Sequence, residues 1–354
     1  MGLFRDPIRD GYPMTSATIL AVEALGFPWQ TLDPFLFCVH HVDHYPAGND
    51  KMGPAASLAG RQLGQDFANI QGWNMYHGST VPGFPKHPHR GFETITVVRN
   101  GFIDHSDSMG ATSRFGAGDT QWMTAGRGVE HCEMFPLRDS AGPNTTELFQ
   151  IWLNLPRRSK LVAPHFSMLW RETQPHMTFT DDAGRAAQVT VPVGSLAGLT
   201  APAAPPDSWA ANLDNGVAIA TIKLAPLATW TLPAALAGLN RALYTFSSGQ
   251  VRIAGDLITG KRRVRIHPDH DVLLQNGDVE SELLLLQGRP INEPVAQYGP
   301  FVMNSRAEID QAFAEYQQGR FGRWPFGASD PVHPREKGRF AIHGDGRVEN
   351  PDTP

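Results

Sequence analysis

A β-strand pattern that occurs twice constrains the fold of this chain more than any other feature. Residues 94–98 form a β-branched run, and Asn100-Gly101, a pair typical of tight hairpin turns, follows it directly. Residues 243–253 repeat the arrangement with an alternating strand, a glycine-containing turn and the start of another strand. This internal similarity indicates a duplicated β-domain.

The composition agrees with two β-rich domains. A chain of 354 residues suits two domains of ordinary size, and a hydrophobic content of 41% allows a sizeable core. The 35 glycines and 29 prolines suit many short strands joined by tight turns.

Charge and hydropathy exclude several classes of partner. The formal net charge of -5 gives no support for nucleic-acid binding. No apolar run approaches the roughly 18 residues that a membrane span needs, and the N-terminus lacks a signal-peptide pattern. The two cysteines, Cys38 and Cys132, cannot form a disulfide framework. We therefore expect a soluble cytoplasmic protein with no nucleic-acid or membrane partner.

Two helices and a tail are expected outside the strands. Residues 15–25 predict one short helix. Ser305 followed by Glu308 forms a capping box for a second helix, and Gly319 is a natural C-terminal stop. Residues 327–354 are rich in glycine, proline and charge and are expected to be extended or poorly ordered.

Two short motifs carry the candidate chemistry. His87 and His89 occupy alternate positions, and so do His131 and Glu133. Since alternate side chains of a strand share one face, each pair points the same way, and the four would converge if their segments are adjacent. Three imidazoles and one carboxylate suit iron, manganese, nickel, copper or zinc. Cys132 lies between two of these residues and points to the opposite face, so we predict that it is not a ligand.

The histidine motifs have a simpler interpretation, in which they do not bind a metal. The chain has 14 histidines, and one His-x-His pair alone is usually a surface or core feature. The combination with a His-x-Glu pair, each beside a glycine-rich turn, is far more specific. Glu93 shares the parity of His87 and His89 and is an alternative carboxylate ligand.

Other residues are weaker candidates. A histidine cluster that follows a predicted strand is expected to form either a polar loop or the mouth of the site; it consists of His40, His41 and His44. A second group is expected either to line the pocket or to belong to the core; it consists of Gln121, Trp122 and Met123.

Three long motifs resemble the pirin family of the cupin superfamily. They are His-Pro-His-Arg-Gly-Phe-Glu-Thr at 87–94, the glycine-rich string at 118–128, and Gln-Tyr-Gly-Pro-Phe-Val-Met-Asn at 297–304. The resemblance covers about residues 33–321. It implies an all-β fold, with two tandem cupin (double-stranded β-helix) barrels and a short C-terminal helix. The limits expected are an N-terminal extension at 1–30, a metal-binding cupin at 31–156, a cupin without metal at 157–300, and a helix and tail at 301–354.

The resemblance also implies a ligand set. The pirin pattern uses His87, His89, His131 and Glu133, whereas the general cupin template would use Glu93 as the carboxylate. We follow the pirin pattern and expect Glu93 to orient a ligand imidazole through a hydrogen bond without binding the metal itself. The expected cofactor is one divalent transition metal, Fe(II) first, with Mn, Ni, Cu or Zn as alternatives.

The second half lacks these ligands. Counting back from Gly249 as from Gly101 places Ala235 and Ala237 where His87 and His89 stand, and Arg241 where Glu93 stands. Small apolar side chains cannot hold a metal. We therefore predict one metal per chain.

The resemblance implies quercetin 2,3-dioxygenase-like activity on a flavonol and dioxygen, with Glu133 as the catalytic base. A rival hypothesis is a metal-dependent, redox-responsive regulator that binds a protein partner without physiological turnover. The same residues serve both. An open, apolar-lined pocket above the metal would favour the enzyme, and a closed one would favour the regulator.

Overall fold

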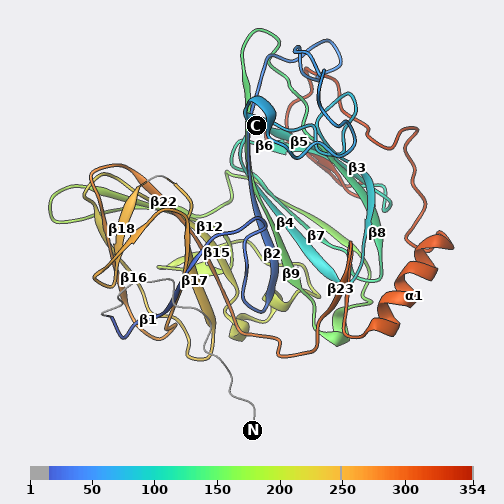
Figure 1. The fold of residues 1–354 in the computed structure, drawn as a ribbon. Helices are drawn as coiled ribbons and strands as arrows, with labels where there is room; N and C mark the ends of the chain where they lie inside the picture. The colour runs from blue at the N-terminus through green and yellow to red at the C-terminus, as the bar shows by residue number, and fades with distance from the viewer. Residues whose placement is uncertain (1–15, 248, 353–354) are drawn as a thin grey trace. The chain divides into compact units, whose positions relative to one another are not determined.

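The computed structural model describes residues 16–247 and 249–352, and nearly all of its regular structure is β (Figure 1). Two compact units divide the chain. The first β-unit consists of Phe37–Thr173, Pro205–Ser208 and Asn292–Pro354, and the second β-unit of Met1–Leu36, Gln174–Ala204 and Trp209–Ile291. Each unit therefore combines segments that lie far apart in the sequence.

The first β-unit is built from a five-stranded and a six-stranded sheet, with a small two-stranded sheet beside its helix. The five-stranded sheet has the order β10 (His165–Leu169), β7 (Thr120–Thr124), β4 (Phe92–Asn100), β9 (Asn144–Asn154) and β2 (Phe35–Tyr45). The six-stranded sheet has the order β26 (Val348–Glu349), β25 (Phe340–Ile342), β6 (Thr112–Gly116), β5 (Phe102–Asp107), β8 (Val129–Met134) and β3 (Gly83–His89). The remaining pair is β23 (Ala296–Tyr298) and β24 (Phe301–Met303), against which α1 (Arg306–Gln317) packs.

The second β-unit is built from a seven-stranded and a four-stranded sheet. The larger sheet has the order β1 (Ile19–Ala24), β20 (Arg262–Ile266), β17 (Asn240–Thr245), β22 (Ser281–Gly288), β15 (Ala218–Leu224), β12 (Ala186–Val193) and β11 (His176–Thr180). The smaller sheet has the order β16 (Thr229–Leu232), β21 (Val272–Asn276), β18 (Gln250–Ile253) and β19 (Asp256–Thr259). A hairpin of β13 (Ser195–Leu196) and β14 (Leu199–Thr200) is separate from both. Short 3-10 turns lie at Ile70–Gly72, Arg157–Ser159, Trp209–Ala211 and Leu213–Asn215.

The two units share one strand order. The order β3-β8-β5-β6 in the first unit corresponds to β16-β21-β18-β19 in the second, and β7-β4-β9-β2 corresponds to β20-β17-β22-β15. The duplication predicted from the sequence is therefore confirmed. Each unit buries the apolar faces of its own sheets, and in the second unit this core draws on both sheets.

The turn at Asn100-Gly101 does not close a hairpin, so that part of the prediction is wrong. β4 ends at Asn100 and β5 begins at Phe102, but β4 belongs to the five-stranded sheet and β5 to the six-stranded one. Gly101 has a φ of 79°, and a Cβ there would lie 2.7 Å from the Thr146 hydroxyl oxygen. The glycine therefore serves a sharp crossing between two sheets.

One predicted helix is wrong and the other is confirmed. Within the described part of residues 15–25, Ile19–Ala24 is the strand β1, which pairs with β20. Near the C-terminus, Ser305 caps α1 by accepting a hydrogen bond from the Glu308 N–H, as the capping box predicts. Gly319 follows the helix with a φ of 71°, which suits a C-terminal stop.

The C-terminal tail is part of the first β-unit, contrary to our expectation. β25 pairs with β6, and Phe340 and Ala341 are buried. Arg339 is 5% exposed and forms ion pairs with Asp119, Glu172 and Asp352. The charges that suggested disorder in the sequence fix the tail in place.

Candidate metal centre

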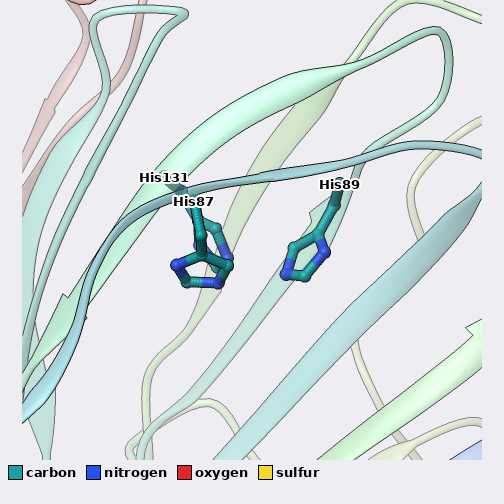
Figure 2. Close-up of side chains that lie close together, drawn as sticks. All are labelled: His87, His89 and His131. Carbon is teal, nitrogen blue, oxygen red and sulfur yellow. The ribbon is translucent and has the colours of Figure 1, made fainter. Parts of the chain in front are cut away.

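Three imidazoles of the first β-unit lie together. The candidate ligand atoms of His87, His89 and His131 are all within 4.8 Å of one another. Figure 2 shows the three side chains projecting to the same side of their strands. Two nitrogens bound to one ion at about 2.1 Å lie at most about 4.2 Å apart, so only a small contraction would be needed to coordinate an ion.

Strand pairing brings these residues together. His87 and His89 are on β3, His131 is on β8, and His87 is directly opposite His131 in the ladder. Since directly opposed residues of an antiparallel pair share a face, the alternation read from the sequence places the rings on one side. The ring centroids of His87 and His131 are 4.4 Å apart.

Backbone carbonyls orient two of the rings. His87 Nδ1 lies 2.9 Å from the Pro85 oxygen, and His89 Nδ1 lies 3.4 Å from the Pro300 oxygen. A ring that donates from Nδ1 presents Nε2 as a free lone pair, which is the usual arrangement of a metal-bound histidine. Both nitrogens of His131 are buried, and neither has a hydrogen-bond partner in the part of the chain that the structure describes.

Burial keeps the three imidazoles neutral. It lowers the pKa of His87 to about 4, and it lowers the pKa of His89 and of His131 well below the usual range of histidine. Each ring is further disfavoured from taking a proton by its histidine neighbours. Neutral imidazole is the form that binds a metal, so the neutral rings of half-buried His87 and of buried His89 and His131 fit a transition metal.

Glu133 does not belong to this close group in the described residues, although it is on the same strand as His131. Thr96 donates a hydrogen bond of 3.0 Å to Glu133 Oε1, and Gln150 donates one of 3.2 Å to Oε2. Burial raises the pKa of Glu133, and these hydrogen bonds and the charge of His105 oppose the rise. The carboxylate therefore faces the interior between the two sheets, where it can serve as a ligand or as a base.

Glu93 has a different environment. It is fully buried and accepts hydrogen bonds of 2.7 Å from Thr124 and 2.6 Å from Ser208. Burial raises its pKa to about 7. No imidazole is among its hydrogen-bond partners in the described structure, so the expected contact with a ligand ring is not seen.

Sequence reasoning missed a fourth imidazole, His105 on β5. It is fully buried, its ring centroid lies 5.4 Å from that of His131, and it is opposite Glu133 in the ladder. Asp107 holds its Nε2 at 3.1 Å, and Asp107 is itself fixed by the N–H groups of Met109 and Ala111. The alternation His105-x-Asp107 is present in the sequence and could have been noticed as a third inward-facing pair.

Unpartnered polar atoms surround the histidines. Buried atoms without a hydrogen-bond partner include His105 Nδ1, both nitrogens of His131 and both polar atoms of the Gln121 amide. Gln121 is opposite Thr96, and Thr96 is opposite Gln150, so the three form one row across the five-stranded sheet. Because native proteins leave few buried polar groups unpaired, this concentration indicates a place for water, an ion or a ligand.

The other candidate residues have ordinary roles. Trp122 and Met123 are buried, and Met123 packs in a small apolar cluster. The expected loop at His40, His41 and His44 is wrong, because all three lie on β2. His40 contacts Glu147 at 2.9 Å and His41 contacts the Tyr76 hydroxyl at 2.8 Å.

Cys132 turns away from the histidines. It is fully buried in an apolar cluster with Val81 and Met134, against which Trp324 and Val332 pack. Burial raises the pKa of its thiol, whereas a cysteine ligand is a thiolate. The parity argument therefore agrees with its surroundings.

A tight backbone holds the end of β3 beside the site. Gly91 has a φ of 84°, and a Cβ there would lie 2.0 Å from the Val302 oxygen. The Lys160 ammonium donates to the oxygens of Gly91 at 2.7 Å and Val302 at 3.1 Å, and to Asn154 Oδ1 at 2.7 Å. The glycine after His-Pro-His-Arg is therefore required by close packing of two chain segments.

The second β-unit has apolar side chains at the equivalent positions. In the ladders that correspond to β3–β8 and β8–β5, Leu232 is opposite Val272 and Ile253 is opposite Leu274. Ala235 and Ala237, to which the count from the turn pointed, lie in the link 233–239 and not on β16, because this link is longer than the link 90–91. Among the described residues, potential metal ligands gather in threes only in the first unit.

Two β-units with one strand order, together with matching family models, define the molecule as a bicupin, a tandem pair of cupin domains. A model described as Pirin matches residues 28–153, and one described as Pirin C-terminal cupin domain matches residues 219–322. The chain belongs to the pirin family.

Relatives support this membership. The chain is 36% identical over 319 residues to a Pseudomonas aeruginosa protein named "Putative quercetin 2,3-dioxygenase PA2418", covering 89% of this chain and 94% of that protein. It is 34% identical over 260 residues to human Pirin, covering 71% and 81%. A crystal structure of Quercetin 2,3-dioxygenase from Acinetobacter baumannii has the same fold, with a TM-score of 0.67 at 24% identity over 86% of this chain and 98% of that one.

Proposed function

We propose that this bicupin is a dioxygenase that acts on flavonol-like substrates, with one Fe(II) held by His87, His89, His131 and Glu133. The observation that carries the proposal is the cluster of three neutral imidazoles in the first β-unit, of which His89 and His131 are buried and His87 is half-buried. A relative named as a quercetin 2,3-dioxygenase supplies the substrate class.

The protein residues have separable roles in this proposal. A divalent transition metal at such a site supplies Lewis acidity and open coordination positions. Glu133 takes the proton of the flavonol 3-hydroxyl, while Thr96 and Gln150 keep its carboxylate directed into the interior. Dioxygen is the oxidant, and the flavonol ring is oxidised and opened.

The test is turnover by protein loaded separately with iron, manganese, nickel and copper. Oxygen uptake and loss of flavonol absorbance are measured and normalised to bound metal. Glu133→Gln should lower turnover by roughly 10²-fold or more beyond any loss of metal, because it removes the base. Glu130→Gln is the matched control, since Glu130 is the neighbouring buried carboxylate on β8 with the opposite parity.

Metal affinity separates the two carboxylates. Glu133→Gln should weaken metal binding more than Glu93→Gln, because Glu93 is engaged by Thr124 and Ser208. Loss of a residue that hydrogen-bonds a metal ligand typically lowers metal affinity by about 10–100-fold, and loss of a ligand itself should lower it more. Equal or reversed losses would favour Glu93 as the metal ligand.

A failure of turnover has a defined consequence. If no metal supports turnover above the free-ion background, the dioxygenase proposal is wrong. The alternative is then a redox-responsive regulator, for which metal oxidation should change the affinity for a protein partner in a pull-down under oxidising and reducing conditions.

A further inference from the structure

The second β-unit contains a cavity that the metal chemistry does not use. Its volume is about 330 Å³. The walls come from the β13–β14 hairpin, from the turns before β15, and from the long link between β16 and β17. Most of the lining is apolar, with Leu196, Leu199, Leu213, Leu236 and Leu239 among it.

Two polar side chains line this cavity with unused hydrogen-bonding atoms. Arg241 is 1% exposed, and its Nε and one terminal nitrogen are buried with no hydrogen-bond partner among the described residues. Gln287 is 5% exposed, is directly opposite Arg241 in the β17–β22 ladder, and has an unpartnered Oε1. The other terminal nitrogen of Arg241 donates to the Pro268 oxygen at 3.3 Å.

No carboxylate of the described residues forms an ion pair with Arg241. The carboxylate whose charge acts on it is Asp271, which is exposed and accepts a hydrogen bond from the Ala234 N–H. Burial lowers the pKa of Arg241 to about 10, so the guanidinium stays charged at neutral pH. A buried cation with neither a paired anion nor a full set of acceptors is costly, and it is retained where a ligand completes it.

Arg241 occupies in the second unit the strand position that Glu93 occupies in the first. Each is the second residue of its strand, and each is opposite a residue of the neighbouring strand, Leu153 of β9 for Glu93 and Gln287 of β22 for Arg241. Where the first unit has imidazoles, the second has Leu232 and Val272, and its longer link 233–239 forms part of the cavity wall.

We propose that this cavity binds a small organic acid, with the carboxylate paired to the Nε and terminal N–H groups of Arg241 and the apolar body against the leucine-rich wall. Arginine presents two parallel donors that match a carboxylate, which favours this anion over a halide. The side-chain amide of Gln287 sits beside the pair and can accept from a protonated or hydroxylated ligand group. The site is independent of the metal centre and of the dioxygenase proposal.

The probe for the test is benzoate, titrated into the full chain by calorimetry at neutral pH. Benzamide, its neutral counterpart, and inorganic phosphate, an anion without an apolar body, are titrated in parallel. We expect saturable benzoate binding and binding of benzamide weaker by on the order of tenfold or more, because benzamide lacks the negative charge and the second acceptor oxygen that pair with the guanidinium. No saturable binding at millimolar benzoate, or phosphate binding as tight as benzoate, would overturn the proposal.

Variants locate the site. Arg241→Met removes the charge and should weaken benzoate binding on the order of tenfold or more. Gln287→Glu places a carboxylate opposite Arg241 and should block benzoate while leaving the unit folded, which keeps the test decisive if Arg241→Met unfolds. Arg252→Met on β18 is the control, since Arg252 is exposed and is not in the cavity wall. Unchanged benzoate affinity in Gln287→Glu would contradict the assignment.

Discussion

Adjacent residues of β8 experience opposite environments. His131 faces an interior that contains buried polar atoms without hydrogen-bond partners in the described residues, while Cys132 faces an apolar cluster. An alternating strand separates these environments within one residue, which is why sequence position alone is a poor guide to metal binding.

Cys132→Ser should keep its metal. The thiol faces away from the three imidazoles and burial keeps it protonated, so its loss removes no ligand. The hydroxyl placed in an apolar cluster should lower the free energy of unfolding by about 1–3 kcal/mol. Metal per chain and thermal unfolding are measured on the same sample, with Cys132→Ala in reserve if the serine variant does not fold. A folded variant without metal would refute the parity argument.

Glu93 should make the stability of the metal-free protein pH-dependent. Its pKa is raised by burial to about 7, against an ordinary value of 4.5. The folded state therefore binds more protons than the unfolded chain between these values, and the stability this group contributes below pH 4.5 is lost as pH rises through about 7.

The variant Glu93→Gln removes that titration. Its free energy of unfolding relative to wild type should rise by about 3 kcal/mol between pH 4.5 and 8. Urea unfolding with a chelator present, repeated across the pH range, measures the difference. If the free energies of unfolding of the two proteins change in parallel with pH, the pKa of Glu93 is not raised in the folded state.

The three histidines could be predicted because their alternation is visible within short motifs. That His105 and Asp107 lie beside these histidines was harder to predict, because two strands, β6 and β7, separate β5 from its partner β8 in the sequence. Thr96 and Gln150 reach Glu133 from the opposite sheet. Contacts across sheets depend on register, which no local pattern specifies.

At the scale of elements, tertiary pairing decided several cases against local preference. Ile19–Ala24 contains good helix formers, yet it is a strand because β20 offers an edge to pair with. α1 was predictable because its cap, its apolar face and its stop are all local. The tail forms β25 because β6 is an edge in need of a partner.

Arg339 should be important for docking that tail. It pairs with Asp119 at 2.9 Å, and Asp119 is fully buried. Arg339→Met would leave Asp119 without its cation and should destabilise the first unit by about 3–5 kcal/mol. Arg347→Met is the control, because Arg347 is 57% exposed and pairs at the surface, so its loss should change stability by less than about 1 kcal/mol. Chemical unfolding of the two variants compares them; equal losses would contradict the buried role of Arg339.

At the scale of the whole molecule, duplication followed by divergence explains what the sequence could and could not reveal. The two tandem cupin domains were predictable because strand and turn patterns recur in both halves. The residue-by-residue correspondence was not predictable, since the link 233–239 is longer than the link 90–91 and leaves Ala235 and Ala237 outside β16. No helix in the described residues is long and apolar enough to cross a membrane. The domain limits inferred from the sequence, with a boundary after Pro156, remain a proposal.

This divergence predicts the metal content of the protein. The paired strands β16, β21 and β18 carry Leu232, Val272, Leu274 and Ile253 where β3, β8 and β5 carry the imidazoles and Glu133, so the described part of the second unit has no equivalent group of donors. Elemental analysis of purified protein should therefore give about one transition metal per chain. At metal concentrations about 100-fold above Kd, binding should raise the free energy of unfolding of the first unit by about 2.7 kcal/mol.

Two double variants test which unit holds that metal. His87→Ala with His131→Ala should remove both the bound metal and the metal-dependent rise in unfolding temperature. His267→Ala with His270→Ala is the matched control, because these two rings are 5.4 Å apart in the second unit and carry the same histidine loss away from the cluster. The control should keep about one metal and the full thermal shift. Two metals per chain in wild type, or full occupancy in the first double variant, would mean that the imidazole cluster is not the principal site.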